Sequence, residues 1–283
     1  MKQRNSMDGI TKYGRFLFGI AIVVLGIESP LIYAGHAAGL ELLPQWILPG
    51  HAFLAYLAGV ALIGAGIIIA IDIKPRSAAI LLGGYFFLSF LFLRTPRMAL
   101  ILRDVGERTR AFETLALCGG AWVLAGTLPI DSTSARGWGI VADKAMELGR
   151  FFLAISMAVF GIDHFVADSL VAGLLPSWLP WHFFWAYLTG FGFIAAAVAI
   201  ATRKYVRLAA ILLGLMFFSV AVLVHAPRLA THLTDSDEWS SGFMALAMAG
   251  TALVTSGIAT NRATAPTGSL TARNASPSCP GGS

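Results

Sequence analysis

The sequence predicts an all-α membrane protein in which eight transmembrane helices form two parallel repeats of a four-helix bundle. Three observations support this fold class. Only 12% of the 283 residues are charged and 57% are hydrophobic, whereas soluble domains contain about 25% charged residues. Eight apolar segments are long enough to cross a hydrocarbon core of about 30 Å. Motifs of the first four segments recur in the same order in the last four, which is typical of an internal duplication.

The predicted spans divide the chain into two four-helix repeats, residues 1–130 and 148–260, joined by a cytoplasmic linker at 131–147. Spans are expected at 14–34, 51–72, 77–94, 111–130, 148–167, 182–201, 207–226 and 242–260. The first span is preceded by basic residues, as in a signal peptide. It is too long for one and contains Glu28, so we expect a membrane helix. Residues 261–283 are rich in Ala, Thr, Ser, Pro and Gly, and we expect them to be disordered.

The repeat is identified by matched polar and turn-forming residues rather than by apolar ones. Both copies contain Gly-Arg-Phe, Ala-Tyr-Leu, AAILLG and Pro-Arg, at an offset that falls from 135 to 131 residues. The segment LLPQWILPGH (42–51) matches LLPSWLPWH (174–182). Each copy has an even number of spans, so both copies enter the membrane from the same side. The predicted repeat is therefore parallel.

The positions of lysine and arginine predict that both termini are cytoplasmic. With the N-terminus inside, the inner segments contain 14 of the 20 basic residues, including all five lysines, in agreement with the positive-inside rule. The outer stretch 94–113 contains five arginines and departs from this rule. Acidic residues alternate with these arginines, so we expect a helical segment with internal ion pairs.

Two acids occupy matched positions inside predicted spans. Glu28 and Asp163 each follow an arginine by 13 residues, which places them about 20 Å along the helix, in the outer half of the membrane. An ionised acid at such a depth needs a cation or water. Arg97 and Arg228, which follow matched prolines, are the expected partners of Glu28 and Asp163 respectively. The alternatives are purely structural ion pairs and interface anchors.

Histidine and tyrosine add further polar groups at the same level. All six histidines fall at outer ends or in outer loops, which is consistent with a polar vestibule that binds a head group or passes protons. His51 and His182 are equivalent in the two copies, and His164 follows Asp163. The LLPxW segments before them are expected to be short re-entrant or surface segments. Hydrogen bonds into the bundle are expected from Tyr56 and Tyr187.

Several activities have no sequence support. No phosphate-binding loop, nucleophile elbow, metalloprotease, haem-attachment or dinucleotide motif is present. The histidine spacing and the two cysteines, Cys118 and Cys279, do not form a metal or dithiol motif. We therefore expect no metal and no covalently bound cofactor. No basic, aromatic-rich surface for nucleic acid is evident. Whether the chain is an enzyme stays open.

The motifs together resemble the DoxX-like family of four-helix membrane proteins, in tandem. The resemblance is carried by residues 161–165 (GIDHF), LLPSWLPWH, Pro227-Arg228 and the matching first-copy stretches, and it covers most of residues 12–260. It implies a four-helix bundle and, for some members, membrane partnership with redox systems linked to quinones or thiols. The first copy departs from the pattern because Glu28-Ser29-Pro30 replaces Asp-His-Phe.

Three functions follow from these features. The first is a membrane subunit or accessory of a redox system, with a quinone-like ligand in the outer leaflet and a redox protein as partner. The head-group site would be lined by Asp163, His164, His182 and Arg228, with a weaker site at Glu28, His51 and Arg97. The second is a small-solute carrier, and the third is a structural or assembly protein without catalysis. In each case the lipid bilayer is a partner, and we expect a bacterial cytoplasmic membrane. The oligomeric state stays open.

Overall fold

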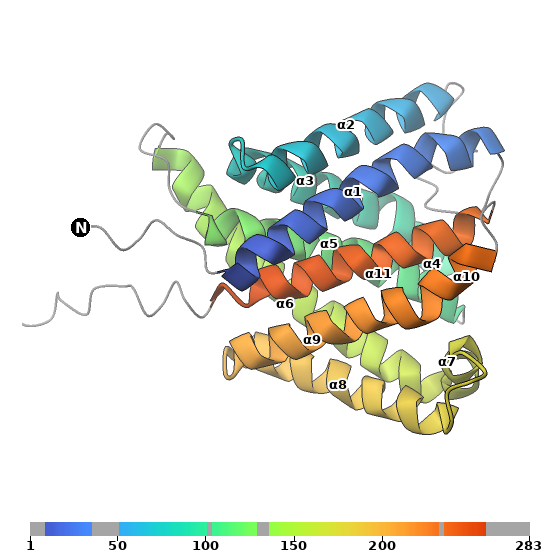
Figure 1. The fold of residues 1–283 in the computed structure, drawn as a ribbon. Coiled ribbons are helices and arrows are strands. Elements are labelled where there is room, and N and C mark those ends of the chain that lie inside the picture. Colours follow the sequence, from blue (N-terminus) through green and yellow to red (C-terminus); the bar gives the residue numbers. More distant parts are fainter. Residues whose placement is uncertain (1–8, 36–50, 101–103, 129–135, 232–234, 259–283) are drawn as a thin grey trace, which may run out of the picture.

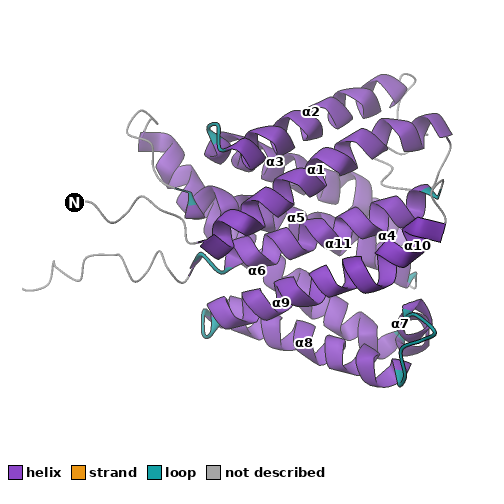
Figure 2. Cartoon of the chain, viewed as in Figure 1, coloured by secondary structure: helices purple, strands orange, loops and turns teal. Residues whose placement is uncertain are grey.

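Helices make up nearly all of the described chain. The computed structural model describes residues 9–35, 51–100, 104–128, 136–231 and 235–258, and these contain no strand (Figure 2). The first LLPxW segment and the predicted disordered tail lie outside the described residues. Within them, a helix is found at each of the eight predicted spans.

The helices of the first half are α1 (Gly9–Gly35), α2 (His51–Ile71), α3 (Pro75–Ser89) and α5 (Val105–Thr127). Those of the second half are α6 (Arg136–Val166), α8 (His182–Thr202), α9 (Val206–Val220) and α11 (Ser236–Thr255). α6 begins at Arg136, so residues 136–147, expected as a linker, are helical. The short helix α7 (Asp168–Leu174) was not predicted from the sequence.

The apolar helices make this chain an integral membrane protein. Five helices of the described part are long and apolar enough to cross a membrane: Gly9–Glu28, Pro75–Leu100, Gly139–Val166, His182–Thr202 and Val206–Thr231. A shorter apolar helix runs from Tyr56 to Ile71. The remaining two, α5 and α11, have acidic first turns and many small residues, and both pack against several other helices. Eight membrane crossings stay a prediction.

The long helices run antiparallel to their neighbours in sequence, so the bundle has two ends. At one end Arg15 pairs with Asp72, and Arg76 donates to the carbonyl of Leu128. We call this the Arg15 end. At the other end α1 and α6 carry Glu28 and Asp163, and α5 and α11 begin. We call this the Glu28 end, and it lies to the right in Figure 1, with α7 and α10.

The two halves are interlocked rather than placed side by side. The first helix of each half packs along the last helix of the other half: α1 lies against α11 (Figure 1) and α6 against α5. The last helices, α5 and α11, also contact each other. One continuous apolar core joins the halves, with Ile22, Leu117, Met157 and Met248 almost completely buried. Two separate four-helix bundles therefore do not describe this packing.

Glycines allow the helices from different halves to approach closely. A Cβ atom added to Gly119 would lie 2.5 Å from the carbonyl oxygen of Gly149, which is far inside van der Waals contact. The matched contact is made between α11 and α1, where a Cβ on Gly250 would lie 2.9 Å from the oxygen of Gly14. Small residues at helix crossings are a common way to pack membrane helices, since backbones then make van der Waals contact directly.

A π-helical turn interrupts the third helix of each half. α3 continues through η1 (Phe90–Arg94) into α4 (Thr95–Leu100), and α9 continues through η2 (Ala221–His225) into α10 (Ala226–Thr231). Pro96 and Pro227 follow directly. Proline has no N–H and its ring clashes with the carbonyl four residues earlier, and the wider π turn accommodates it. Such turns are frequent at functional sites, and here they bring polar side chains to the Glu28 end.

The two central helices begin in the same way. Asp104 and Asp235 both have extended backbone conformations at the N-cap. The Asp104 carboxylate accepts from the N–H of Glu107 at 3.1 Å, and that of Asp235 accepts from the N–H of Asp237 at 2.9 Å. These caps satisfy backbone donors at the start of α5 and α11.

Candidate functional site

Asp163 forms an ion pair across the two halves. Its Oδ1 atom accepts from Nε of Arg108 at 2.8 Å and from Nη2 at 2.5 Å, and Thr109 Oγ1 lies 3.4 Å from Oδ2. The side chain of Asp163 is only 5% exposed. The prediction that Arg228 is the partner of Asp163 is wrong, because α6 packs against α5 and the acid faces that helix.

Glu28, an acid of the first half, contacts the last helix of the second half, and its neighbour there is a serine rather than an arginine. Ser240 on α11 donates to Oε1 of Glu28 at 2.5 Å, and the residue is buried, with 8% of its surface exposed. The predicted pairing of Glu28 with Arg97 is wrong, because α1 packs along α11. Ser240 follows Thr109 by 131 residues, so each acid contacts a hydroxyl at the matched position of the opposite half.

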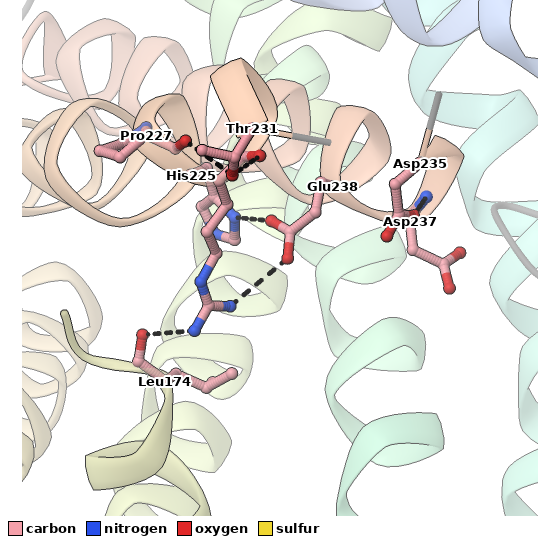
Figure 3. Close-up of polar contacts among 8 residues, drawn as sticks. Leu174, His225, Pro227, Thr231, Asp235, Asp237 and Glu238 are labelled. Carbon is pink, nitrogen blue, oxygen red and sulfur yellow. Dashed lines mark hydrogen bonds and ion pairs between the residues drawn. The ribbon is translucent and has the colours of Figure 1, made fainter. Parts of the chain in front are cut away.

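The matched arginines are paired with matched glutamates instead. Arg97 lies 3.7 Å from Glu107, and Arg228 lies 3.4 Å from Glu238. Arg228 also donates from Nη2 to the carbonyl of Leu174 at 2.8 Å, so it ties α10 to the end of α7 (Figure 3). The sequence contained a signal for these pairs, since both glutamates follow their arginines by ten residues.

A histidine–glutamate pair distinguishes the second half. Nδ1 of His225 lies 3.3 Å from Oε2 of Glu238, beside Arg228 (Figure 3). Their side chains are 18% and 21% exposed, so the pair is partly accessible. A carboxylate only accepts, so Nδ1 is the nitrogen that carries the proton, and in the neutral imidazole Nε2 then offers its lone pair. The matched position in the first half is Arg94, which is buried. The sequence predicted only that His225, like the other five histidines, lies toward the outer side; its contact with Glu238 was not predicted.

Two of the predicted site histidines, His164 and His182, have described side chains, and each lies against a backbone carbonyl oxygen rather than against Asp163 or Arg228. Nδ1 of His164 lies 2.7 Å from the carbonyl oxygen of Phe160, and its ring lies 5.1 Å from that of Phe193 on α8. Adjacent residues of a helix point in different directions, so His164 and Asp163 do not converge. His182 is 3.0 Å from the carbonyl oxygen of Pro176, which stabilises the turn before α8.

The predicted tyrosines lie on outer faces of the bundle. Tyr187 is 37% exposed and donates to Oδ2 of Asp168 at 2.6 Å, and it stacks on Phe165 with ring centroids 5.9 Å apart. Tyr56 is 50% exposed, so the expected hydrogen bond into the bundle is not supported there. His51 is the first residue of α2, and its side chain is outside the described part.

The second LLPxW segment forms an exposed turn between α7 and α8. Trp178 and Trp181 are 63% and 76% exposed, and Trp181 has a left-handed backbone with φ 58° before α8 begins. Exposed tryptophans of this kind suit an interface with lipid head groups. A re-entrant path for this segment stays a prediction.

Among the polar contacts of the Glu28 end are those of Asp163 with Arg108, Glu28 with Ser240, Glu107 with Arg97, and Glu238 with His225 and Arg228. Within the described ranges no group of three potential metal ligands occurs, and Cys118 is a buried free thiol. Of these contacts, the His225–Glu238 pair is the one that combines partial exposure with a proton acceptor.

The Arg15 end carries its own buried charges. Arg150 is 6% exposed and donates from Nη1 to the carbonyls of Ile200 at 2.9 Å and Ala201 at 2.5 Å. Glu147 lies 3.4 Å from Arg150 and also pairs with Arg203. These contacts close the α6–α8 corner, so we interpret them as structural.

The comparisons with known proteins add no relative: no protein-family model, no curated protein and no solved structure matches this chain.

Proposed function

We propose that this chain is the membrane subunit of a redox system and that His225 and Glu238 accept a proton from a quinol-type ligand. In this proposal eight spans form two parallel DoxX-like repeats in a bacterial cytoplasmic membrane, with both termini cytoplasmic and the Glu28 end outside. The observation that carries the proposal is the His225–Glu238 pair at 3.3 Å.

The geometry of this pair fits the chemistry of a quinol. A quinol loses two protons and two electrons when it is oxidised. Glu238 holds the Nδ1–H of His225, so Nε2 is the acceptor for one of these protons, and Glu238 stabilises the resulting imidazolium. The second proton leaves to water, to which the pair is partly exposed. Arg228 positions Glu238 from the other side. The electrons go to a redox centre of a partner protein, since Cys118 is a buried lone thiol.

The difference between the halves supports one site rather than two. Both halves contain the arginine–glutamate pair, but the first half has Arg94 at the position of His225. An arginine stays protonated in proteins and therefore does not accept a proton. The second half is the site in this proposal, and the first half is its scaffold.

A structural role is the second candidate. It is favoured by the pairing of Arg97, Arg108 and Arg228 with acids of the same chain, since these charges are satisfied without a ligand. In that case the polar groups of the Glu28 end only hold the helices together.

The test is purification in native lipid followed by mass spectrometry of bound small molecules. We expect a bound quinone that is lost from His225→Gln and Glu238→Gln variants. His182→Gln is the matched control, because His182 lies at the same end but bonds to a backbone carbonyl. Equal quinone retention in all three variants would refute the site. If native protein contains no quinone and binds none when it is added, the structural role is favoured.

A further inference from the structure

Glu28 lies among helices whose described residues place no lysine or arginine beside it. The two helices that pack along α1 are α2 and α11, and neither contains a lysine or an arginine. On α1 itself the nearest basic residue, Arg15, is 13 residues away, or about 20 Å. Among the described residues, no basic side chain forms an ion pair with Glu28.

The titratable groups of α11 near Glu28 do not supply a positive charge. On α11, Asp237 is acidic and contributes repulsion, while Glu238 is paired with His225 and Arg228. On α2, the titratable residues of this end are His51 and Tyr56. In the described chain the hydroxyl of Ser240 donates to Oε1 of Glu28, and the backbone N–H of Ser240 also donates to this carboxylate.

The matched acid of the second half shows what is missing. Asp163 has Arg108 against its carboxylate, and the position 131 residues after Arg108 is Trp239. Trp239 stacks on Phe243, with ring centroids 5.7 Å apart. Glu28 therefore has a hydroxyl against its carboxylate, and the position that supplies a guanidinium to Asp163 is occupied in the other half by an indole.

An ionised carboxylate buried at membrane depth without a countercharge is strongly unfavourable. We propose that Glu28 is a proton-binding site: it holds a proton in the resting protein and exchanges it with water at the Glu28 end, where Asp237 in the first turn of α11 is exposed. Asp163 has the countercharge that Glu28 lacks among the described residues, because Arg108 lies against its carboxylate. The two halves thus use matched acids differently, and this inference does not depend on the quinol site.

Labelling with dicyclohexylcarbodiimide tests the proposal, because this reagent adds to protonated carboxyl groups in apolar surroundings. The purified full chain is treated in lipid nanodiscs, and the modified residue is located by peptide mass spectrometry. We expect the label on Glu28 and not on Asp163. Exchanging Trp239 and Arg108, the matched residues of the two halves, should reverse which acid is labelled. Trp239→Arg should lower labelling of Glu28 by about tenfold or more, since a cation favours the ionised form, and Arg108→Trp should make Asp163 reactive.

Two further readouts keep the test decisive if an exchanged variant does not fold. The infrared band of a protonated carboxyl should be present in the native protein, reduced in Glu28→Gln and unchanged in Asp163→Asn. Adding Na⁺ at constant pH should not protect Glu28 from the reagent. The proposal is overturned if Glu28 is unlabelled and the infrared band does not depend on it, or if Na⁺ protects it, since a metal cation would then be its countercharge.

Discussion

Replacement of Arg108 by alanine should destabilise the protein strongly, because it leaves Asp163 buried without a cation. The wild-type contact consists of two N–H···O hydrogen bonds, at 2.8 and 2.5 Å, to a side chain that is 5% exposed. Removing one partner of a buried ion pair costs about 3–5 kcal/mol. Arg108 is itself 25% exposed, so we expect the lower end of that range, about 3 kcal/mol.

The matched control is Arg110→Ala, two residues further along α5. Arg110 pairs with Glu107 at 3.0 Å, but its side chain is 44% exposed, and exposed pairs contribute at most about 1 kcal/mol. Both variants are measured by equilibrium unfolding with increasing SDS in mixed micelles. The double variant Arg108→Leu/Asp163→Leu should recover much of the loss, because no charge is then left unpaired. Equal losses for Arg108→Ala and Arg110→Ala would refute the reasoning, as would a double variant whose loss is the sum of the single ones.

Two further stability predictions concern the helix crossings and the caps. Gly250→Ala should lower the free energy of unfolding by about 1–3 kcal/mol, because its Cβ would lie 2.5 Å from the backbone nitrogen of Phe18. Gly64→Ala, where no atom lies within 4 Å of the added Cβ, should be neutral or stabilising; the same unfolding assay compares them, and equal effects would contradict the crossing. Asp104→Ala should cost about 1 kcal/mol through loss of the α5 cap, while Asp104→Asn should keep most of it. If both Asp104 variants unfold alike, the cap does not stabilise α5.

The helices were predictable because each long apolar segment must satisfy its backbone hydrogen bonds internally. Proline and the matched Gly-Arg-Phe and Pro-Arg motifs marked their positions in both halves. α7 and the helical start of α6 were missed, since α7 has only seven residues and the start of α6 has charged residues and glycines among its apolar ones, so neither is a long apolar segment. Whether such a segment forms a helix or a loop depends on tertiary contacts, such as the hydrogen bond from Tyr187 to Asp168 at the start of α7.

For the acids of the Glu28 end, the sequence predicted the residues but not their partners. Glu28 and Asp163 were identified as unusual because charge inside an apolar segment is costly. Their partners were assigned within the same half, to Arg97 and Arg228, whereas the structure places each acid against the last helix of the other half. Sequence separation within a repeat is a poor guide to partners when the repeats interlock.

What the sequence by itself determined is the helical membrane fold, the positions of eight helices and the presence of two buried acids. These depend on local hydropathy and on the cost of burying charge, which are properties of each segment. Only the tertiary structure decided which helices touch. The close glycine contacts of Gly14 with Gly250 and of Gly119 with Gly149 join α1 to α11 and α6 to α5. That exchange gives Asp163 an arginine and leaves Glu28 with a serine, because the neighbours of an acid are set by backbone packing between distant segments.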